Sequence, residues 1–313
     1  MKLFLCIIFF CPLLSKAQSW LADSMIKINS LQASVSFLAN DDLQGRLTGT
    51  DAALQAAKFI AEKMDTAGLK PLPGKQNYFD SFPASNYGKK INGLNVIGFL
   101  PGNAANDSLV IFSAHYDHIG KGNDVQYNKD YRYDDEIFNG ANDNATGVAA
   151  LLELAKYYGA QKTNRYNILF IAFAGEELGL QGSTAYVNKI KPGLVKAVIN
   201  LEMLGIPTNE NCFVISLGNR QRLKNSLNTS LTTRLSSAEK NFFVTDPYID
   251  DNLSYRSDHY PFARKIKNAF TIMATSPTDE FYHTVDDEYE TIDFYFLLKA
   301  TRNIALACES FIR

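Results

Sequence analysis

The stretch LVIFSAHYDHIG, residues 109–120, predicts both a fold class and the position of a site. Its first six residues are apolar or small on consecutive positions, which is typical of a strand covered on both faces. The next six residues carry two histidines and an aspartate. In open α/β sheets, ligands bind beyond the carboxyl ends of the strands, so we expect these polar residues to lie where a ligand would bind.

Apolar segments elsewhere in the chain extend this pattern. Four of them predict further strands, at residues 94–100, 168–174, 197–204 and 269–274. Helical spacing predicts helices at about residues 48–68, 144–159, 179–189, 219–239 and 291–311. Strands that alternate with helices favour an α/β fold. We therefore expect a single layered domain with a mostly parallel, mixed central sheet flanked by helices, because no linker or internal repeat divides the chain.

The composition limits the classes of function. The chain has 313 residues, of which 46% are hydrophobic, enough for a large α/β core. A net charge of −2, with scattered lysines and arginines, argues against a nucleic acid or an anionic membrane surface as a partner. Outside the N-terminal segment only Cys212 and Cys308 remain; they could form one disulfide or be two buried thiols, and they are too few for a cysteine-type zinc site.

The first 17 residues match a secretory signal peptide. One lysine precedes an apolar run at residues 3–14, and the small residues Ser15 and Ala17 follow it. We expect cleavage after Ala17, a mature domain at residues 18–313 and a secreted or periplasmic location. The apolar run is too short for a permanent membrane anchor. Neither Cys6 nor Cys11 lies in a lipobox-like setting, so no anchor is expected on the mature protein.

Acidic and imidazole side chains follow the predicted strands. They are His115 after 109–114, Glu176 and Glu177 in GEELG after 168–174, Glu202 in NLEML, Asp143 in GANDNATG, and His283 in the loop before the last predicted helix. The ends of these strands should meet at one edge of the sheet. Imidazole and carboxylate are the ligands of catalytic zinc, which keeps a coordination position open for water. The sequence therefore predicts a zinc site at this edge.

The setting of Asp143 suits a ligand shared by two metal ions. A helix cap would explain an aspartate at this position equally well if it stood alone. Small residues flank it, however, so that its carboxylate could approach two cations closely. Glu176 and Glu177 are adjacent and should point in different directions. One could bind metal while the other takes a proton from water, and the residues alone leave open which does which.

Six ordered motifs carry a family resemblance: GRLTGT (45–50) with GLKP (68–71), AHYDHIG (114–120), NGANDNATGVAALLELA (139–155), AFAGEELGLQGS (172–183), NLEML (200–204) and YHTVDDEYETID (282–293). Together they resemble the secreted co-catalytic di-zinc aminopeptidases, whose family includes glutamate carboxypeptidases, animal glutaminyl cyclases and the non-enzymatic transferrin receptor ectodomain. The match runs from about residue 38 to the C-terminus. It implies a zinc-exopeptidase-like fold for the domain at 18–313.

The resemblance also implies a role for each ligand position. His115 would bind a first zinc ion, with Asp117 orienting its ring. Asp143 would bridge the two ions, and Glu177 and His283 would bind the second. Glu202 stands where most members of the family carry aspartate. It remains a competent ligand but is one methylene longer, so the first metal should sit differently or bind more weakly.

The implied reaction is hydrolysis of a peptide bond near a free N-terminus by a water activated by two zinc ions. In that reaction Glu176 would be the general base, and Tyr282 would hydrogen-bond the oxyanion. The implied partners are peptides with a free N-terminus, and the oligomeric state stays open. Asp258 and His259, in SDHYPF, recur in the family and are expected to support the site.

Three alternatives remain. A glutaminyl cyclase, a transferase with one zinc, should lose the first metal, whereas HYDHIG and Glu202 are both present here. A carboxypeptidase needs a basic pocket for the substrate carboxylate, and Arg132, Arg220 and Arg256 are candidate donors. A non-catalytic binding module predicts lost ligands, whereas every ligand position keeps a metal-binding side chain.

Overall fold

The computed structural model describes residues 20–122, 135–235 and 241–313. The expected signal peptide, Arg132 and most of the loop at 120–138 lie outside these ranges. In the described part of the chain, no helix is long and apolar enough to cross a membrane. Cys212 and Cys308 are two free, buried thiols, which settles the alternative that the sequence left open.

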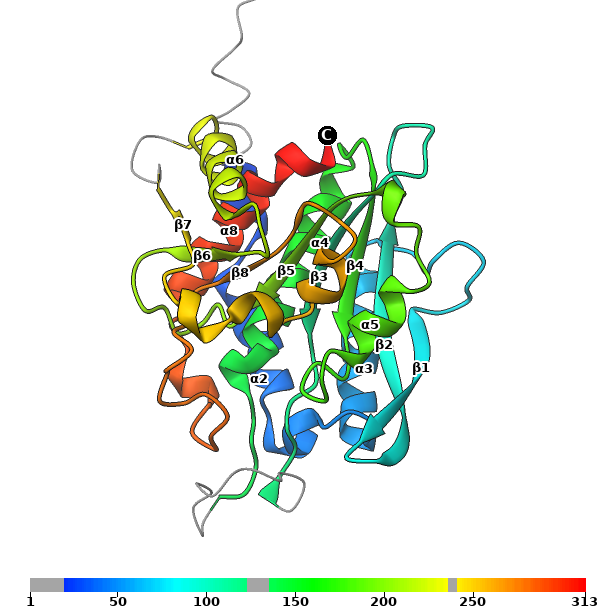
Figure 1. Ribbon diagram of the computed structural model, residues 1–313, viewed down its shortest axis with the longest axis vertical. Helices are drawn as coiled ribbons and strands as arrows, with labels where there is room; N and C mark the ends of the chain where they lie inside the picture. Colours follow the sequence, from blue (N-terminus) through cyan, green and yellow to red (C-terminus); the bar gives the residue numbers. More distant parts are fainter. Residues whose placement is uncertain (1–19, 123–134, 236–240) are drawn as a thin grey trace, which may run out of the picture.

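One eight-stranded mixed sheet forms the centre of the molecule, in the order β1-β2-β4-β3-β5-β8-β6-β7 (Figure 1). The strands are β1 Phe79–Asn86, β2 Lys89–Leu100, β3 Leu109–His115, β4 Asn167–Phe173, β5 Val195–Glu202, β6 Cys212–Ile215, β7 Phe243–Thr245 and β8 Ala269–Met273. The four central strands β4, β3, β5 and β8 are mutually parallel. The strands β1, β2 and β6 pair antiparallel at the two sides. The predicted mostly parallel, mixed sheet is confirmed.

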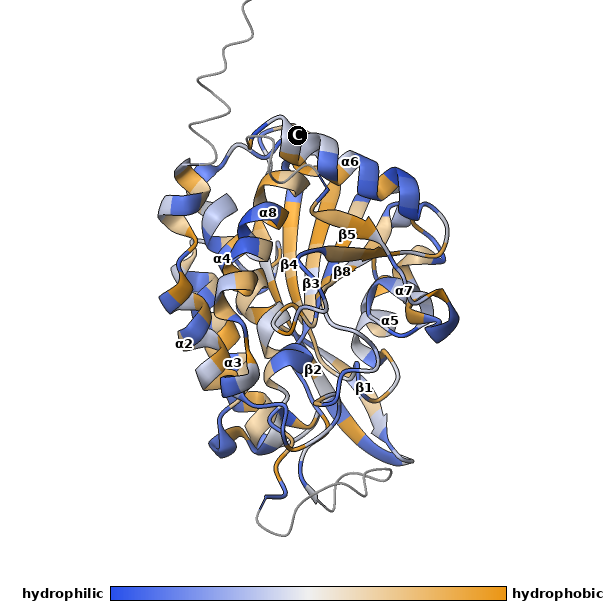
Figure 2. Ribbon diagram, turned by 90° about the vertical axis from the view of Figure 1, so that its left-hand side faces the viewer, coloured by the Kyte–Doolittle hydropathy of each residue, from blue (hydrophilic) through white to orange (hydrophobic). Residues whose placement is uncertain are grey.

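Helices cover both faces of the sheet. They are α2 Ile28–Leu38, α3 Asp51–Thr66, α4 Gly147–Gln161, α5 Gln181–Val187, α6 Arg220–Thr232, α7 His259–Ala263 and α8 Phe294–Ile312. Along β3, Val110 and Phe112 pack into the cluster that contains α2, α3, α4, α6 and α8. Ile111 faces the opposite cluster, which contains α5 and α7. The central strands are therefore apolar on both faces, as their colour in Figure 2 shows.

The elements differ from the prediction at the margins of the sheet and in the helices α2 and α7, which were not predicted. The strands β1, β6 and β7 were not predicted: β1 is a largely polar edge strand with Pro83 inside it, and β6 and β7 have four and three residues. The helix α4 begins at Gly147 rather than at residue 144. The helix α6 ends at Thr232, short of the predicted limit.

The connections of the central strands create a crevice at their carboxyl ends. From β3 the chain crosses through α4 to β4 on one side, and from β4 it crosses through α5 to β5 on the other side of β3. Helices on opposite faces of the sheet make these two crossings. A ligand crevice forms where neighbouring connections part in this way. The residues that end β3, β4 and β5 therefore face a common opening.

Candidate metal centre

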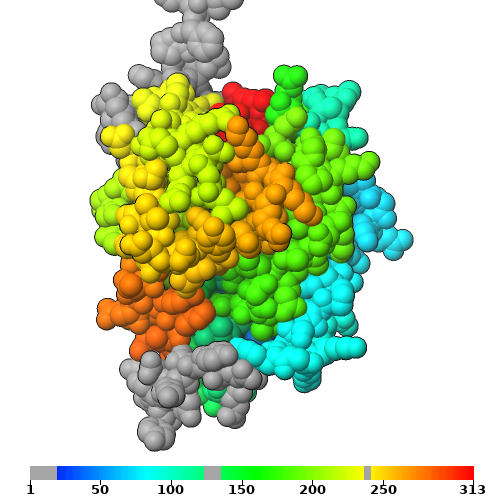
Figure 3. Space-filling model, in the orientation of Figure 1, coloured from blue at the N-terminus to red at the C-terminus, as the bar shows by residue number. Residues whose placement is uncertain are grey.

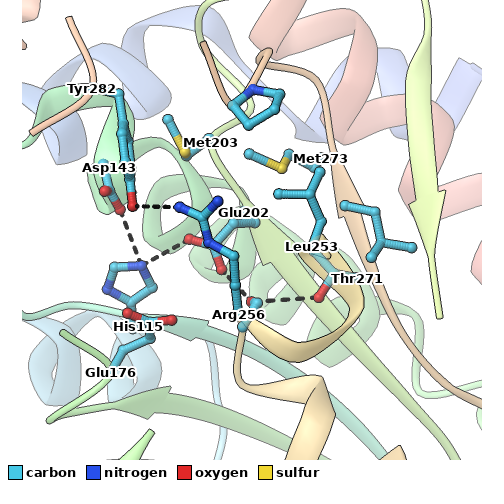
Figure 4. Close-up of a pocket in the computed structure, with 13 residues that line it drawn as sticks. His115, Asp143, Glu176, Glu202, Met203, Leu253, Arg256, Thr271, Met273 and Tyr282 are labelled. Carbon is cyan, nitrogen blue, oxygen red and sulfur yellow. Dashed lines mark hydrogen bonds and ion pairs between the residues drawn. The ribbon is translucent and has the colours of Figure 1, made fainter. Parts of the chain in front are cut away.

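The predicted ligands come from five different segments and meet at this opening. His115 is the last residue of β3, and Glu202 is the last residue of β5. Glu177 follows β4, Asp143 lies in the turn before α4, and His283 lies in the loop between β8 and α8. Figure 4 shows His115, Asp143 and Glu202 pointing toward one another. The convergence predicted from the strand ends is therefore present in the structure.

Asp143 lies at the centre of the group, and its two carboxylate oxygens face different histidines. The Oδ1 atom is 3.1 Å from Nε2 of His115. The Oδ2 atom is 3.2 Å from Nε2 of His283. The carboxylate is almost completely buried, so neither oxygen is left to bulk water. A carboxylate placed in this way can be shared between two cations.

Each carboxylate oxygen of Asp143 belongs to a separate set of donor atoms. On one side Nε2 of His115 lies 2.7 Å from Oε1 of Glu202. On the other side Nε2 of His283 lies 3.2 Å from Oε2 of Glu177. Within each set, the donor atoms lie within 4.8 Å of one another. Ligand atoms about 2.0–2.1 Å from a tetrahedral zinc ion are about 3.3–3.4 Å apart. The contacts of His283 and the contact of His115 with Asp143 are close to this spacing, whereas His115 and Glu202 are at hydrogen-bond distance and would have to move apart around an ion.

The turn at residues 141–146 explains how Asp143 reaches the opening. Asp143 and Asn144 have non-helical backbone angles there, and the peptide bond between them is cis. The carboxylate of Asp287 accepts the backbone N–H groups of Asn142 (2.7 Å) and Asp143 (3.0 Å). The side chain of Asn144 accepts the first amide of α4, that of Gly147, at 3.1 Å. The side chain of Asn144 thus satisfies this amide, and the carboxylate of Asp143 is not used for capping.

The small residues around Asp143 are required by close approaches. Gly140 has φ +57°, and a Cβ atom there would lie 2.3 Å from the carbonyl oxygen of Asp143. A Cβ atom at Gly147 would lie 2.2 Å from Oδ1 of Asn144. Both contacts are far shorter than packed atoms allow, so neither position tolerates a side chain without movement of the turn. The two glycines therefore allow the turn to pack tightly around Asp143, and the close approach of its carboxylate to two cations stays a prediction.

A buried arginine holds the segments beneath the site together. Arg46, in the GRLTGT motif, is 1% exposed. Its guanidinium donates to the carbonyl oxygens of Leu38, Tyr116, Asn139 and Gly140. Two of these carbonyls lie just before the turn of Asp143, and one lies just after His115. One side chain thus joins the segments that carry two predicted ligands.

The carboxylate of Asp117 is buried and fully engaged. Its oxygens accept the hydroxyl of Thr48 (2.9 Å) and the backbone N–H groups of Gly175 (2.8 Å) and Glu176 (3.3 Å). Nδ1 of His115 is 3.1 Å from the backbone oxygen of Asp117 and 3.7 Å from its carboxylate. The orientation of the His115 ring therefore depends more on the carbonyl than on the carboxylate. The carboxylate instead fixes the backbone that carries Glu176.

Glu202 belongs to a buried hydrogen-bond network. Its Oε2 atom accepts the hydroxyl of Ser257 at 2.6 Å and the amide of Asn200 at 3.2 Å. Its other oxygen is the one that faces His115. The extra methylene of glutamate is therefore accommodated with both oxygens in fixed positions. In the neighbouring segment His259 is fully buried and pairs with Thr271 at 2.7 Å, beside the same network.

A pocket opens next to the two donor sets. Met203, Leu253 and Met273 form an apolar part of its lining. Arg256 and Tyr282 lie across from them, with 3.4 Å between the guanidinium and the phenol oxygen (Figure 4). On the face shown in Figure 3, the segment around residues 245–258 (yellow) borders the segment at 275–293 (orange), which brings this pair together. The pocket is therefore apolar on one side and polar on the other.

Opposite charges shift the pKa values of the group in the metal-free protein. Burial lowers the pKa of the His283 imidazole, but Glu177 and Asp143 outweigh burial and raise it to about 11. Burial and Asp143 raise the pKa of the Glu177 carboxyl, but His283 and the hydrogen bond to His118 outweigh them and bring it down to about 2. Burial raises the pKa of Glu176 well above its usual range, His115 opposes this rise, and Glu177 reinforces it. The two adjacent glutamates thus differ in proton affinity, as a ligand and a base should.

Several residues of the site were not assigned a role from the sequence. Each is far in sequence from the group that it contacts, so no local pattern marks it: Arg46, Thr48, His118, Ser257 and Asp287. The motifs that contain Arg46 and Asp287 were recognised only as parts of a resemblance, whereas His118 was expected near the site, in the polar stretch after 109–114, without a role of its own. The structure gives these three residues definite partners.

Comparisons with known proteins agree with this geometry. The model of peptidase family M28 matches residues 95–308. "Aminopeptidase YwaD" of Bacillus subtilis is 30% identical over 212 residues, which cover 63% of this chain and 40% of that protein. The chain thus matches less than half the length of this relative.

Two solved structures share the fold. The structure of "BSAP, a zinc aminopeptidase from Bacillus subtilis" has a TM-score of 0.71 and 17% identity, over 92% of this chain and 96% of that chain. A glutaminyl cyclase from Porphyromonas gingivalis has a TM-score of 0.71 and 18% identity, over 91% of this chain and 99% of that chain. At these identities the likeness shows a common fold alone.

Proposed function

The chain belongs to peptidase family M28, and on that premise we propose that it is a zinc-dependent aminopeptidase that removes residues from the free N-terminus of peptides. The observation that carries the proposal is the position of Asp143 between two complete sets of nitrogen and oxygen donors. A cyclase that uses one zinc would not need the first set, formed by His115, Asp143 and Glu202. The name of the relative YwaD supports the choice of aminopeptidase over the other activities.

The proposal assigns two zinc ions to the two sets. His115, Asp143 and Glu202 would hold one ion, and Asp143, Glu177 and His283 would hold the other. The bound ions would polarise the scissile carbonyl and lower the pKa of water. The donor types suit zinc, which takes imidazole and carboxylate ligands. BSAP, described in its title as a zinc aminopeptidase, supports this choice of metal.

The remaining groups of the chain have roles that follow from their positions. Glu176 takes a proton from the attacking water and passes it to the leaving amine, for which its raised proton affinity is suited. Asp117 keeps the backbone of Glu176 in place. The hydroxyl of Tyr282, which lies in the same pocket, donates a hydrogen bond to the oxyanion that forms on the carbonyl.

The part of the proposal that concerns location rests on residues 1–17 of the sequence. Their charge and apolar pattern support export with cleavage after Ala17. The mature domain would then act on peptides outside the cytoplasm.

Arg256 favours a second candidate function, carboxypeptidase activity. It is a cation that lines the pocket beside Tyr282, where it could pair with a substrate carboxylate. The apolar side chains on the opposite wall fit an uncharged substrate side chain equally well, so the aminopeptidase remains our choice.

One experiment separates these functions. The zinc-loaded protein is incubated with a pentapeptide, with its N-acetylated form and with its C-terminal amide. An aminopeptidase cuts the free and amidated peptides and leaves the acetylated peptide intact. Cleavage of the acetylated peptide but not the amidated one would instead establish a carboxypeptidase. Cyclisation of an N-terminal glutamine without peptide cleavage would establish the cyclase.

A further inference from the structure

His118 is a fully buried histidine at the metal centre to which no role has been given. It follows the ligand position His115 by three residues, just beyond β3. Its Nδ1 atom lies 2.8 Å from Oε1 of Glu177 and 4.0 Å from Oδ2 of Asp143. Two explanations fit these distances. The ring is either an additional metal ligand or a hydrogen-bond donor that fixes Glu177.

Neighbouring groups confine the plane of the His118 ring. Its edge meets the ring of His283, with the centroids 5.5 Å apart and an angle of 75° between the planes. On another side Gly140 lies so close that a Cβ atom there would be 2.5 Å from Cγ of His118. The ring is thus confined between Gly140 and His283. In this position the hydrogen bond of 2.8 Å to Oε1 of Glu177 directs Nδ1 toward the donor set.

The second nitrogen of the ring distinguishes the two explanations. The Nε2 atom of His118 is buried and has no hydrogen-bond partner among the described residues. If Nδ1 bound a metal ion, Nε2 would carry the proton and would be a buried donor without an acceptor. Histidines that bind metals almost always donate that second N–H to a partner. If the proton is on Nδ1, it is donated to Glu177, and only an acceptor lone pair is left unpaired.

We propose that His118 is a positioning residue that donates its Nδ1–H to Oε1 of Glu177 and thereby turns Oε2 toward the metal. The Oε2 atom is the one that lies 3.2 Å from Nε2 of His283, within the second donor set. Glu177 then binds through one oxygen only, and the second oxygen is held away from the ion. This leaves a coordination position open for substrate. The inference rests on the proposed role of Glu177 as a metal ligand.

Two substitutions at this position test the inference. In His118→Asn the side-chain amide nitrogen can occupy the place of Nδ1 and keep the donor, whereas His118→Leu removes it and keeps an apolar volume. Zinc affinity is measured by competition with a chromophoric chelator, and zinc content is measured per chain. The Co²⁺-loaded forms are compared by visible absorption, which reports coordination number. Circular dichroism of each metal-free variant shows whether it folds.

We expect a loss of affinity for one zinc ion in the Leu variant and not in the Asn variant. His118→Leu should lose about 10- to 100-fold in affinity for one of its two zinc ions, as for other groups that orient a metal ligand. Its Co²⁺ spectrum should shift toward higher coordination, because Glu177 can then bind through both oxygens. His118→Asn should stay close to the wild type in both measurements.

Three outcomes would overturn the inference. Equal loss in both variants would make His118 a metal ligand itself, because an amide does not replace an imidazole on zinc. Wild-type affinity and spectrum in His118→Leu would leave the residue without a role. An unfolded Leu variant beside a folded Asn variant with reduced affinity would likewise exclude a hydrogen-bonding role. If instead the wild type binds no zinc, the proposed function fails, and the inference fails with it.

Discussion

Replacement of Arg46 by methionine should weaken both the fold and the metal centre. Methionine matches the aliphatic stem of arginine but has no donor for the carbonyl oxygens of Leu38, Tyr116, Asn139 and Gly140. These oxygens lie in the interior, where a buried group without a partner is costly. Burial destabilises the charged form of the arginine. It lowers the pKa of Arg46 to about 10, although Asp287 and other acidic groups oppose this shift.

The expected loss of stability can be derived because the substitution removes one partner, the guanidinium, from a buried charged network. Such changes cost about 3–5 kcal/mol of the free energy of unfolding. For a domain of this size, one kcal/mol corresponds to about 2 °C, so the midpoint of thermal unfolding should fall by about 6–10 °C. Arg46→Lys should lose nearly as much, because an ammonium group cannot reach four carbonyls in the planar arrangement of a guanidinium.

Differential scanning calorimetry of the metal-free proteins provides the measurement. The matched control is Arg222→Met on α6, an exposed arginine, which should leave the midpoint nearly unchanged. Zinc affinity should also fall in Arg46→Met, because the segments that carry His115 and Asp143 are no longer tied together. A midpoint within about 2 °C of the wild type, together with unchanged zinc affinity, would refute the role assigned to Arg46.

Three further predictions follow from the site and its surroundings. Glu176→Gln should lower kcat by about 10²–10⁴-fold while both zinc ions stay bound, and a variant that keeps most of its activity would remove Glu176 as the base. Zinc binding at pH 7.5 should release protons, among them the one held by His283, because Glu177 and Asp143 raise its pKa to about 11 against the effect of burial. Titration calorimetry in buffers of different ionisation enthalpy counts these protons, and identical heats in all buffers would contradict this shift. Burial lowers the pKa of His259 to about 3. The unfolded chain therefore binds a proton on this histidine below about pH 6.5, whereas the folded protein does not, and the free energy of unfolding decreases as the pH falls toward 3. Urea unfolding should show about 2–3 kcal/mol more loss between pH 6.5 and 4.5 for the wild type than for His259→Asn, and equal losses would exclude this role.

The central sheet could be predicted from sequence because burial on both faces leaves a strong local signal. The strands β3, β4, β5 and β8 and the second half of β2 are mainly apolar, so their approximate limits were found, whereas the polar first half of β2, from Lys89, was missed. The edges carry no such signal. The strand β1 is held by its pairing with β2 rather than by its own composition, and β7 is only three residues long. The apolar spacing of Leu31, Val35 and Leu38 in α2 was a usable signal that the prediction did not take up.

The convergence of the candidate ligands could be predicted because strand order brings the ends of β3, β4 and β5 together. Their supporting residues could not, because each acts across a long stretch of chain. Arg46 reaches carbonyls 70 and 94 residues away, and Asp287 holds an amide 144 residues away. Local rules explain Asp143, Asn144 and Thr146 equally well as cap-forming residues. In the structure Thr146 is at the N-cap position without a side-chain cap, and the side chain of Asn144, not that of Asp143, accepts the first amide of α4.

Anomalous diffraction at the zinc edge from a zinc-loaded crystal would test the central claim most directly. Two peaks should appear on opposite sides of the Asp143 carboxylate. One should lie among His115, Asp143 and Glu202, and the other among Asp143, Glu177 and His283. A single peak on one side of Asp143, or peaks that these side chains do not surround, would contradict the two-ion centre.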